Sequence, residues 1–198
     1  GMVDEARQRL RALVDALHPL AEAGVAVVGL EPSCLFTLRD EALVLGLGPR
    51  AEVVARQALM FEEFVAREVK AGRFALPGLK PFEGPGAPAK SLLVHGHCHQ
   101  KAFGAVSPVL EVLRLIPGAR PELIESSCCG MAGSFGYEAK HQAVSKQMAE
   151  LSLLPAVRKA PEAIVVADGT SCRHQIADGA GREAVHVARL LASRLDGP

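Results

Sequence analysis

The residues best suited to chemistry are two adjacent cysteines, Cys128 and Cys129, in the stretch Ser126-Ser127-Cys128-Cys129-Gly130-Met131-Ala132-Gly133-Ser134-Phe135-Gly136. Neighbouring side chains leave the backbone in different directions, so both sulfurs reach one object only if the chain bends tightly around it. Gly130 allows that bend because it tolerates a positive φ and has no Cβ. A disulfide between neighbours would be strained. The pair therefore either binds a metal ion or cluster as thiolates, or packs as two small buried apolar side chains.

Alternating strands and helices are expected to position these cysteines. Short apolar runs predict buried strands at 25–29, 91–94, 122–124 and 163–167. Helical spacing of apolar residues predicts helices at 4–21, 35–45, 49–70, 107–115, 138–159 (with a break near Pro155) and 182–195. The glycine- and proline-rich stretch Gly72–Lys90 is expected to be a loop or linker. This order predicts an α/β fold in which a parallel sheet of about four strands is flanked by helices in Rossmann-like layers.

The cysteines follow the predicted strands. Each of the five lies a few residues past a strand end: Cys34, Cys98, Cys128, Cys129 and Cys172. In a parallel sheet these positions meet at the carboxyl edge, where open α/β folds place their sites. Most of them also lie where a helix begins, and a helix N-terminus lowers the pKa of a thiol. Scattered core cysteines would have no reason to share one edge, so the pattern favours ligation over burial.

The four later thiols suit an iron–sulfur cluster or a tetrahedral zinc ion: Cys98, Cys128, Cys129 and Cys172. Their spacing differs from the paired knuckles of zinc fingers and ribbons. Three histidines lie near Cys98: His97 and His99 flank it, and His95 shares a side with His97 if the strand extends. They could be ligands or could form hydrogen bonds around the sulfurs; the second role is favoured. Arg173 follows Cys172 at a predicted helix start, where a positive charge would stabilise a reduced, anionic cluster.

Composition excludes several other classes of function. The chain has 198 residues, and its 22 basic and 22 acidic side chains balance, so nothing attracts nucleic acid or an anionic membrane. No apolar run is long enough to span a bilayer. An odd number of irregularly placed cysteines argues against a disulfide scaffold and favours a reducing, cytoplasmic setting. No glycine-rich nucleotide motif is present. A cysteine nucleophile with a histidine base would leave the other thiols unexplained.

A weak internal repeat suggests the domain organisation. Residues 27–35 resemble residues 165–173, since both read as apolar strand, short turn, Ser-Cys and helix. The repeat predicts that residues 2–90 are the C-terminal half of a first cysteine-rich repeat and residues 91–198 a complete second one, in a longer polypeptide. The two could also pack as one compact unit. Cys34 is expected to belong to a separate site with upstream ligands; the alternative is a single sheet that brings Cys34 to the other sulfurs.

Three segments resemble the cysteine-rich "CCG" domain family: His97-Cys98-His99, the stretch from Cys128 to Gly136, and Thr170-Ser171-Cys172-Arg173. That family includes the cysteine-rich subunit of heterodisulfide reductase and the iron–sulfur subunits of glycolate oxidase and anaerobic glycerol-3-phosphate dehydrogenase. The similarity is strongest to the C-terminal part of FAD-linked D-2-hydroxyacid dehydrogenases.

The resemblance implies an iron–sulfur electron-transfer domain, of 4Fe–4S type, in a larger oxidoreductase that oxidises a glycolate- or lactate-type 2-hydroxy acid. FAD would lie on a separate domain, and the partners would be flavin and ferredoxin-like domains, with any membrane association coming through partners. This chain alone would not be catalytic. The implied ligands are Cys98, Cys128, Cys129 and Cys172, with Cys34 in its own site and Gly130, His97, His99 and Arg173 around the cluster. The alternatives are a docking domain without a cluster and a thiol redox domain of the heterodisulfide type.

The sequence departs from the family pattern at one position. The full pattern ends each repeat in C-x-x-C, but Gly169 stands where the first of those cysteines would be, and Glu31 stands there in the earlier copy. A five-thiolate cluster is therefore in doubt. Four sulfurs could hold a simpler cluster, supplemented by a histidine or by a residue from outside this chain.

Overall fold

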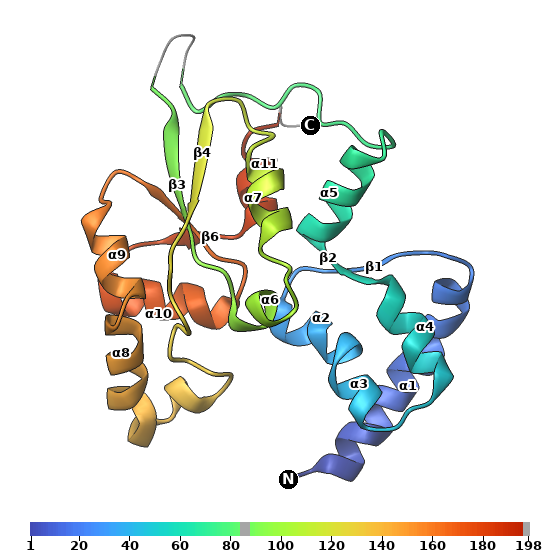
Figure 1. Ribbon diagram of the computed structural model, residues 1–198. Helices are drawn as coiled ribbons and strands as arrows, with labels where there is room; N and C mark the ends of the chain where they lie inside the picture. The colour runs from blue at the N-terminus through green and yellow to red at the C-terminus, as the bar shows by residue number, and fades with distance from the viewer. Residues whose placement is uncertain (84–87, 196–198) are drawn as a thin grey trace. The chain divides into compact units, whose positions relative to one another are not determined.

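The computed structural model describes residues 1–83 and 88–195, and the chain forms two compact units, Gly1–Phe64 and Val65–Pro198. Both units are mixtures of helices and parallel strands, as predicted (Figure 1). None of the helices in these described residues is long and apolar enough to cross a membrane.

The first unit is mainly helical. Its elements are α1 (Val3–Glu22), β1 (Val27–Gly29), α2 (Pro32–Arg39), α3 (Glu41–Val44), α4 (Pro49–Gln57), β2 (Ala58–Met60) and the beginning of α5 (Phe61–Lys70). Strands β1 and β2 pair in parallel, with Val28 opposite Leu59. The strand predicted at 25–29 is confirmed as β1, and it pairs with β2 in a separate two-stranded sheet. The alternative of one sheet that contains all four predicted strands is therefore wrong.

The predicted single helix at 49–70 is also wrong, because β2 interrupts it. Ala58 and Met60 are almost fully buried, at 1% and 0% exposed. Their extended backbone supplies β1 with a partner, which a continuous helix could not do. The carboxylate of Glu63 accepts a hydrogen bond from the Met60 backbone N–H at 2.9 Å and pairs with Arg39 at 2.7 Å. Tertiary pairing therefore overrides the helix propensity of Ala-Leu-Met.

The second unit contains the predicted parallel sheet. Its elements are β3 (Lys90–Val94), α6 (Cys98–Ala102), α7 (Ser107–Leu113), β4 (Ala119–Leu123), two 3₁₀ turns (Phe135–Tyr137 and Ala139–His141), α8 (Gln142–Glu150), α9 (Leu153–Lys159), β5 (Ile164–Val166), α10 (Thr170–Ala180), β6 (Ala184–Val185) and α11 (Val187–Ala192). The strand order is β4-β3-β5-β6, and every pair is parallel. Val94, at the end of β3, lies opposite both Leu123 and Val166, so the strands end side by side.

Helices cover both faces of this sheet, with α9 and α10 on one side and α7 and α11 on the other (Figure 1). Leu93 and Val165 face the first pair of helices, where they pack in one core with Leu153, Val157 and Ile176. This core also contains Cys129 and Cys172. The central strands β3 and β5 are largely buried, which explains their mainly apolar sequences, whereas the edge strand β4 (Ala-Arg-Pro-Glu-Leu) is mostly exposed.

Two predicted helices of this unit are wrong at their beginnings. The helix expected at 138–159 is replaced by a 3₁₀ turn, α8 and α9, and the break between these helices precedes Pro155. Pro155 lies in the first turn of α9, where its missing N–H has no intrahelical partner to lose. The helix expected at 182–195 starts only at Val187, because Ala184–Val185 pairs with β5 as an edge strand.

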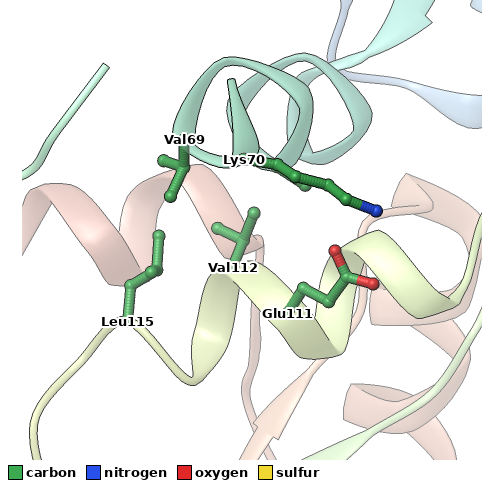
Figure 2. Close-up of a pocket in the computed structure, with 6 residues that line it drawn as sticks. Val69, Lys70, Glu111, Val112 and Leu115 are labelled. Atoms are coloured by element: carbon green, nitrogen blue, oxygen red, sulfur yellow. The ribbon is translucent and has the colours of Figure 1, made fainter. Parts of the chain in front are cut away.

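The described part of the predicted loop Gly72–Lys90 contains no helix or strand before β3 begins at Lys90, and residues 84–87 lie outside the described residues. The second half of α5, from Val65 onward, precedes this loop and belongs to the second unit. There, a pocket of about 300 Å³ lies between α5 and α7. Figure 2 shows Val69 facing Val112 and Leu115, with the charged ends of Lys70 and Glu111 at one side. No cysteine lines this pocket, so the cysteine chemistry lies elsewhere.

Candidate metal centre

Three strand ends of the second unit bring four sulfurs together. Cys98 opens α6 after β3, Cys128 and Cys129 follow β4, and Cys172 lies in the first turn of α10 after β5. The sulfurs of Cys129 and Cys172 are 3.4 Å apart, and the Cys98 thiol forms a hydrogen bond with Cys128. The cysteines of this unit thus lie at the carboxyl ends of the strands, as predicted. Cys34 is exposed near the start of α2 in the other unit, and its separate site stays a prediction.

A tight turn allows both adjacent cysteines to face the site. Gly130 has φ +88°, and a Cβ there would lie 2.1 Å from the backbone oxygen of Ser145. The Gln175 amide donates to the Cys129 carbonyl at 2.9 Å and to that Ser145 oxygen at 3.0 Å, which ties the turn to α8. The Gly130 N–H in turn donates to the Cys128 sulfur at 3.2 Å. Only glycine fits this position.

Side-chain hydrogen bonds hold the Cys98 segment against the Cys172 segment. His97 caps α6, because its imidazole accepts from the His99 N–H at 3.2 Å while the Gln100 side chain accepts from the His97 N–H at 2.9 Å. Gln100 also donates to the buried carboxylate of Asp168 at 2.9 Å. Asp168 lies just after the end of β5, and Gln100 lies in α6, just after β3. The hydrogen bond between them therefore fixes the spacing between the ends of these two strands.

The His97 ring also explains why a glycine stands at position 169. A Cβ on Gly169 would lie 2.5 Å from His97 Cδ2 and 3.2 Å from the Cys172 sulfur. Cβ atoms essentially never come that close to other atoms, so a cysteine at 169 and the present position of His97 exclude each other. The imidazole of His97 therefore occupies the space that a cysteine side chain at position 169 would need.

The four thiols differ in burial and in charge. Cys129 and Cys172 are buried, Cys128 is partly buried and Cys98 is exposed. Hydrogen bonds from the Cys129 and Cys98 thiols and from the Gly130 N–H hold the pKa of Cys128 far below its usual range. The hydrogen-bond contact with Cys129, together with the nearby His95, lowers the pKa of Cys172 to about 5. The pKa values of Cys98 and Cys129 shift in the opposite direction, since the neighbouring Cys128 thiolate and burial raise them. The surroundings therefore favour the thiolate form at Cys128 and Cys172 and the thiol form at Cys98 and Cys129.

The sequence reasoning grouped His95 with His97 and His99, favoured hydrogen bonds over ligation for all three, and did not include His95 among the predicted site residues. This side chain is 2% exposed, and one of its ring nitrogens and the sulfurs of Cys129 and Cys172 all lie within 4.8 Å of one another. Its Nδ1 lies 2.9 Å from the Ser126 hydroxyl, whereas its Nε2 is buried without a hydrogen-bond partner among the described residues. His95 directly continues the apolar run of β3, and a polar residue in that position was the signal available in the sequence.

Two basic side chains bind the backbone beside the cysteine segments. Lys101, which the sequence reasoning also left out, donates from Nζ to the backbone oxygens of Ser126 and Ser127, the latter at 2.8 Å. Burial lowers the pKa of Lys101, and the nearby cysteine thiolates oppose that shift. The predicted Arg173 donates to the carbonyls of Ala167 and Asp168 at the end of β5. Its expected effect on a cluster stays a prediction.

The predicted His99 lies beside His97, with their ring centroids 5.2 Å apart. Its role at a cluster, like that of the whole predicted ligand set, stays a prediction. What the structure places together is Cys98, Cys128, Cys129 and Cys172, with Gly130, His97 and His95 against them.

Comparison with known proteins finds similarity to parts of two kinds of dehydrogenase. No family model matches the chain. The chain is 28% identical to a subunit of the anaerobic glycerol-3-phosphate dehydrogenase of Escherichia coli, over 98% of its own length and 47% of that subunit. It is also 28% identical to D-2-hydroxyglutarate dehydrogenase of Escherichia coli, over 96% of this chain and 18% of that protein. The same enzyme of Pseudomonas putida is 28% identical over 88% of this chain and 16% of its own length. The chain therefore spans less than half the length of these relatives and is similar to one part of each.

Proposed function

We propose that this chain is the iron–sulfur electron-transfer domain of a larger flavin-linked oxidoreductase that oxidises a small 2-hydroxy acid. The observation that carries the proposal is the convergence of four cysteine sulfurs from three strand ends. The names of two relatives support it, since one is a subunit of a dehydrogenase and the other a dehydrogenase of a 2-hydroxy acid. The flavin would be bound by another domain or subunit.

The residues of the site fit an iron–sulfur cluster. Thiolates are the usual ligands of such clusters, and the low pKa values of Cys128 and Cys172 supply two of them before any metal arrives. Cys98, Cys128, Cys129 and Cys172 would hold the cluster, of 4Fe–4S type. A bound cluster supplies one-electron transfer at a potential set by charge, hydrogen bonds and solvent exposure.

The surrounding residues would tune that electron transfer. The Gly130 N–H, which donates to the Cys128 sulfur, and the ammonium of Lys101 would both stabilise a more negative, reduced state. Buried Cys129 and Cys172 keep water from one side of the site, whereas Cys98 is exposed. The Cys98 side is therefore the side on which a redox partner would approach most closely.

A single zinc ion is a second candidate, favoured by one distance. Two thiolates on one tetrahedral zinc ion, each at about 2.3 Å, lie about 3.8 Å apart. The sulfurs of Cys129 and Cys172 lie at 3.4 Å, close to that value, and His95 could complete the set. In that case the domain would be a structural or docking domain without a cluster.

Anaerobic reconstitution separates the two candidates. The purified chain is treated with iron and sulfide, and bound iron, acid-labile sulfide and zinc are measured together with the visible and EPR spectra. We expect about four iron and four sulfide per chain for a 4Fe–4S cluster. Cys129→Ser should lose the cluster, while Cys34→Ser, in the other unit, should keep it.

The longer parent protein supplies the functional test. Cys129→Ser should abolish electron transfer to its acceptor and leave reduction of the flavin by substrate intact. Unchanged electron transfer in that variant, or zinc in place of iron in anaerobically prepared parent protein, would contradict the cluster and favour the docking domain.

A further inference from the structure

His95 is a buried side chain that the four-cysteine site leaves unexplained. It lies at the end of β3, is 2% exposed, and has a ring nitrogen within 4.8 Å of the sulfurs of Cys129 and Cys172. We propose that His95 is a metal ligand, which binds through Nε2 beside these two cysteines and makes the centre a mixed nitrogen–sulfur site. The inference rests on the proposed function only for the identity of the group bound in the cell.

The first argument is the unsatisfied nitrogen. Nε2 of His95 is shielded from water and has no hydrogen-bond partner in the described part of the chain. A buried polar atom without a partner costs about 1–3 kcal/mol. Native structures contain few such atoms, and an absent ion is one of their standard explanations. A metal ion bound between Nε2 and the two sulfurs would remove this cost.

The second argument is the way the ring is held. Nδ1 lies 2.9 Å from the hydroxyl of Ser126, which leaves Nε2 as the nitrogen available to a metal. Lys101 donates to the Ser126 carbonyl and lies 3.4 Å from its hydroxyl, so Ser126 is itself held in place. A ligating histidine commonly uses its second nitrogen for such a hydrogen bond, which fixes the ring orientation and the tautomer.

The third argument is the composition of the donor set. Gly169 has no thiol to contribute, and the ring of His97 fills the space that a side chain there would need. His95 reaches the same two sulfurs, Cys129 and Cys172, from the neighbouring strand end. The imidazole is neutral, whereas a fifth thiolate would be anionic. A cluster with this nitrogen ligand should therefore be easier to reduce than one with thiolates alone, because histidine ligation raises the potential in Rieske centres.

Cobalt(II) titration of the metal-free full chain tests the proposal without any iron or sulfide. We expect wild-type protein to bind Co²⁺ with absorption bands from both sulfur and nitrogen ligation. His95→Ala should weaken Co²⁺ binding by about 100-fold, since even indirect partners of a ligand are worth about 10- to 100-fold. His95→Cys should restore affinity and add sulfur-to-metal absorption. The control is His174→Ala, which removes an exposed histidine bound to Tyr137, and it should leave affinity unchanged.

A measurement on unmutated protein guards against variants that fail to fold. In protein labelled with ¹⁵N-histidine, Zn²⁺ addition should shift one Nε2 resonance to a metal-bound position, and that resonance should be absent from His95→Cys. Unchanged Nε2 resonances on zinc binding, or equal Co²⁺ affinities of wild type and His95→Ala, would overturn the proposal. These readouts are independent of the cluster. A chain that binds Co²⁺ through His95 but takes up no iron and sulfide would keep this inference and contradict the proposed function.

Discussion

Replacement of Gly130 by alanine tests whether the turn between the paired cysteines is as tight as described. Gly130 has φ +88°, and a Cβ there would meet the Ser145 backbone oxygen at 2.1 Å and the Gln175 amide nitrogen at 3.2 Å. Gly133, three residues later, is the matched control. It also has a positive φ, +65°, but a Cβ there has nothing within 4 Å.

The two substitutions should differ several-fold in cost. For Gly133→Ala only the left-handed backbone is penalised, by about 1–2 kcal/mol. Gly130→Ala carries a backbone cost of about 1–3 kcal/mol. Because its neighbour is a backbone oxygen that cannot rotate away, overpacking adds about 1–3 kcal/mol. The buried hydrogen bonds of Gln175 are strained as well, so we expect a total loss of about 3–6 kcal/mol, a large part of the usual stability of about 5–15 kcal/mol of a domain.

Urea unfolding of the metal-free protein, followed by tyrosine fluorescence, measures this difference. Tyr137 is the single tyrosine and the chain has no tryptophan, so the signal reports on the second unit. With a urea dependence of about 1–3 kcal/mol per M, a mid-range difference of about 3 kcal/mol places the Gly130→Ala midpoint about 1–3 M below that of Gly133→Ala. Equal midpoints would refute the close approach to Ser145 and, with it, the tight turn that presents both cysteines.

Three further experiments follow from the site. In the metal-free protein at pH 7, iodoacetamide should label Cys128 faster than Cys98, as measured by peptide mass spectrometry. Cys98 is more exposed, but the lowered pKa of Cys128 makes it the thiolate. Faster labelling of Cys98 would contradict this. Gly169→Cys should lower the thermal unfolding midpoint, because the new side chain clashes with the His97 ring. The double variant Gly169→Cys with His97→Ala should recover part of that loss. Equal midpoints for the single and double variants would argue against the clash. Gln100→Ala should cost about 2 kcal/mol in urea unfolding, because it removes the Gln100 hydrogen bond to Oδ2 of the buried Asp168 carboxylate and leaves the His97 N–H without its acceptor. A cost below about 0.5 kcal/mol, the usual size for a surface substitution, would contradict that bridge.

Local pattern predicted β3, β5 and the helix after Cys172 correctly, because β3 and β5 are short, largely apolar and buried runs. It predicted only the end of the exposed strand β4, whose sequence is Ala-Arg-Pro-Glu-Leu, and it did not predict α6. It failed where long-range pairing decides the conformation. The propensities of Ala58–Met60 favour a helix, but this segment forms a strand because its backbone pairs with β1. Ala184–Val185 becomes an edge strand because its backbone pairs in parallel with β5. Such pairings depend on residues far apart in the chain, which a local window cannot see.

The same division holds for the site. The sequence by itself determined which residues could carry the chemistry: cysteines after successive parallel strands must meet at one edge, and a glycine after paired cysteines marks a tight turn. Only the tertiary structure decided that His95 lies against Cys129 and Cys172 and that His97 fills the space beside Gly169. The physical reason is that residue types and spacing specify which strand end a side chain belongs to, whereas packing between strand ends decides which side chains share the remaining volume.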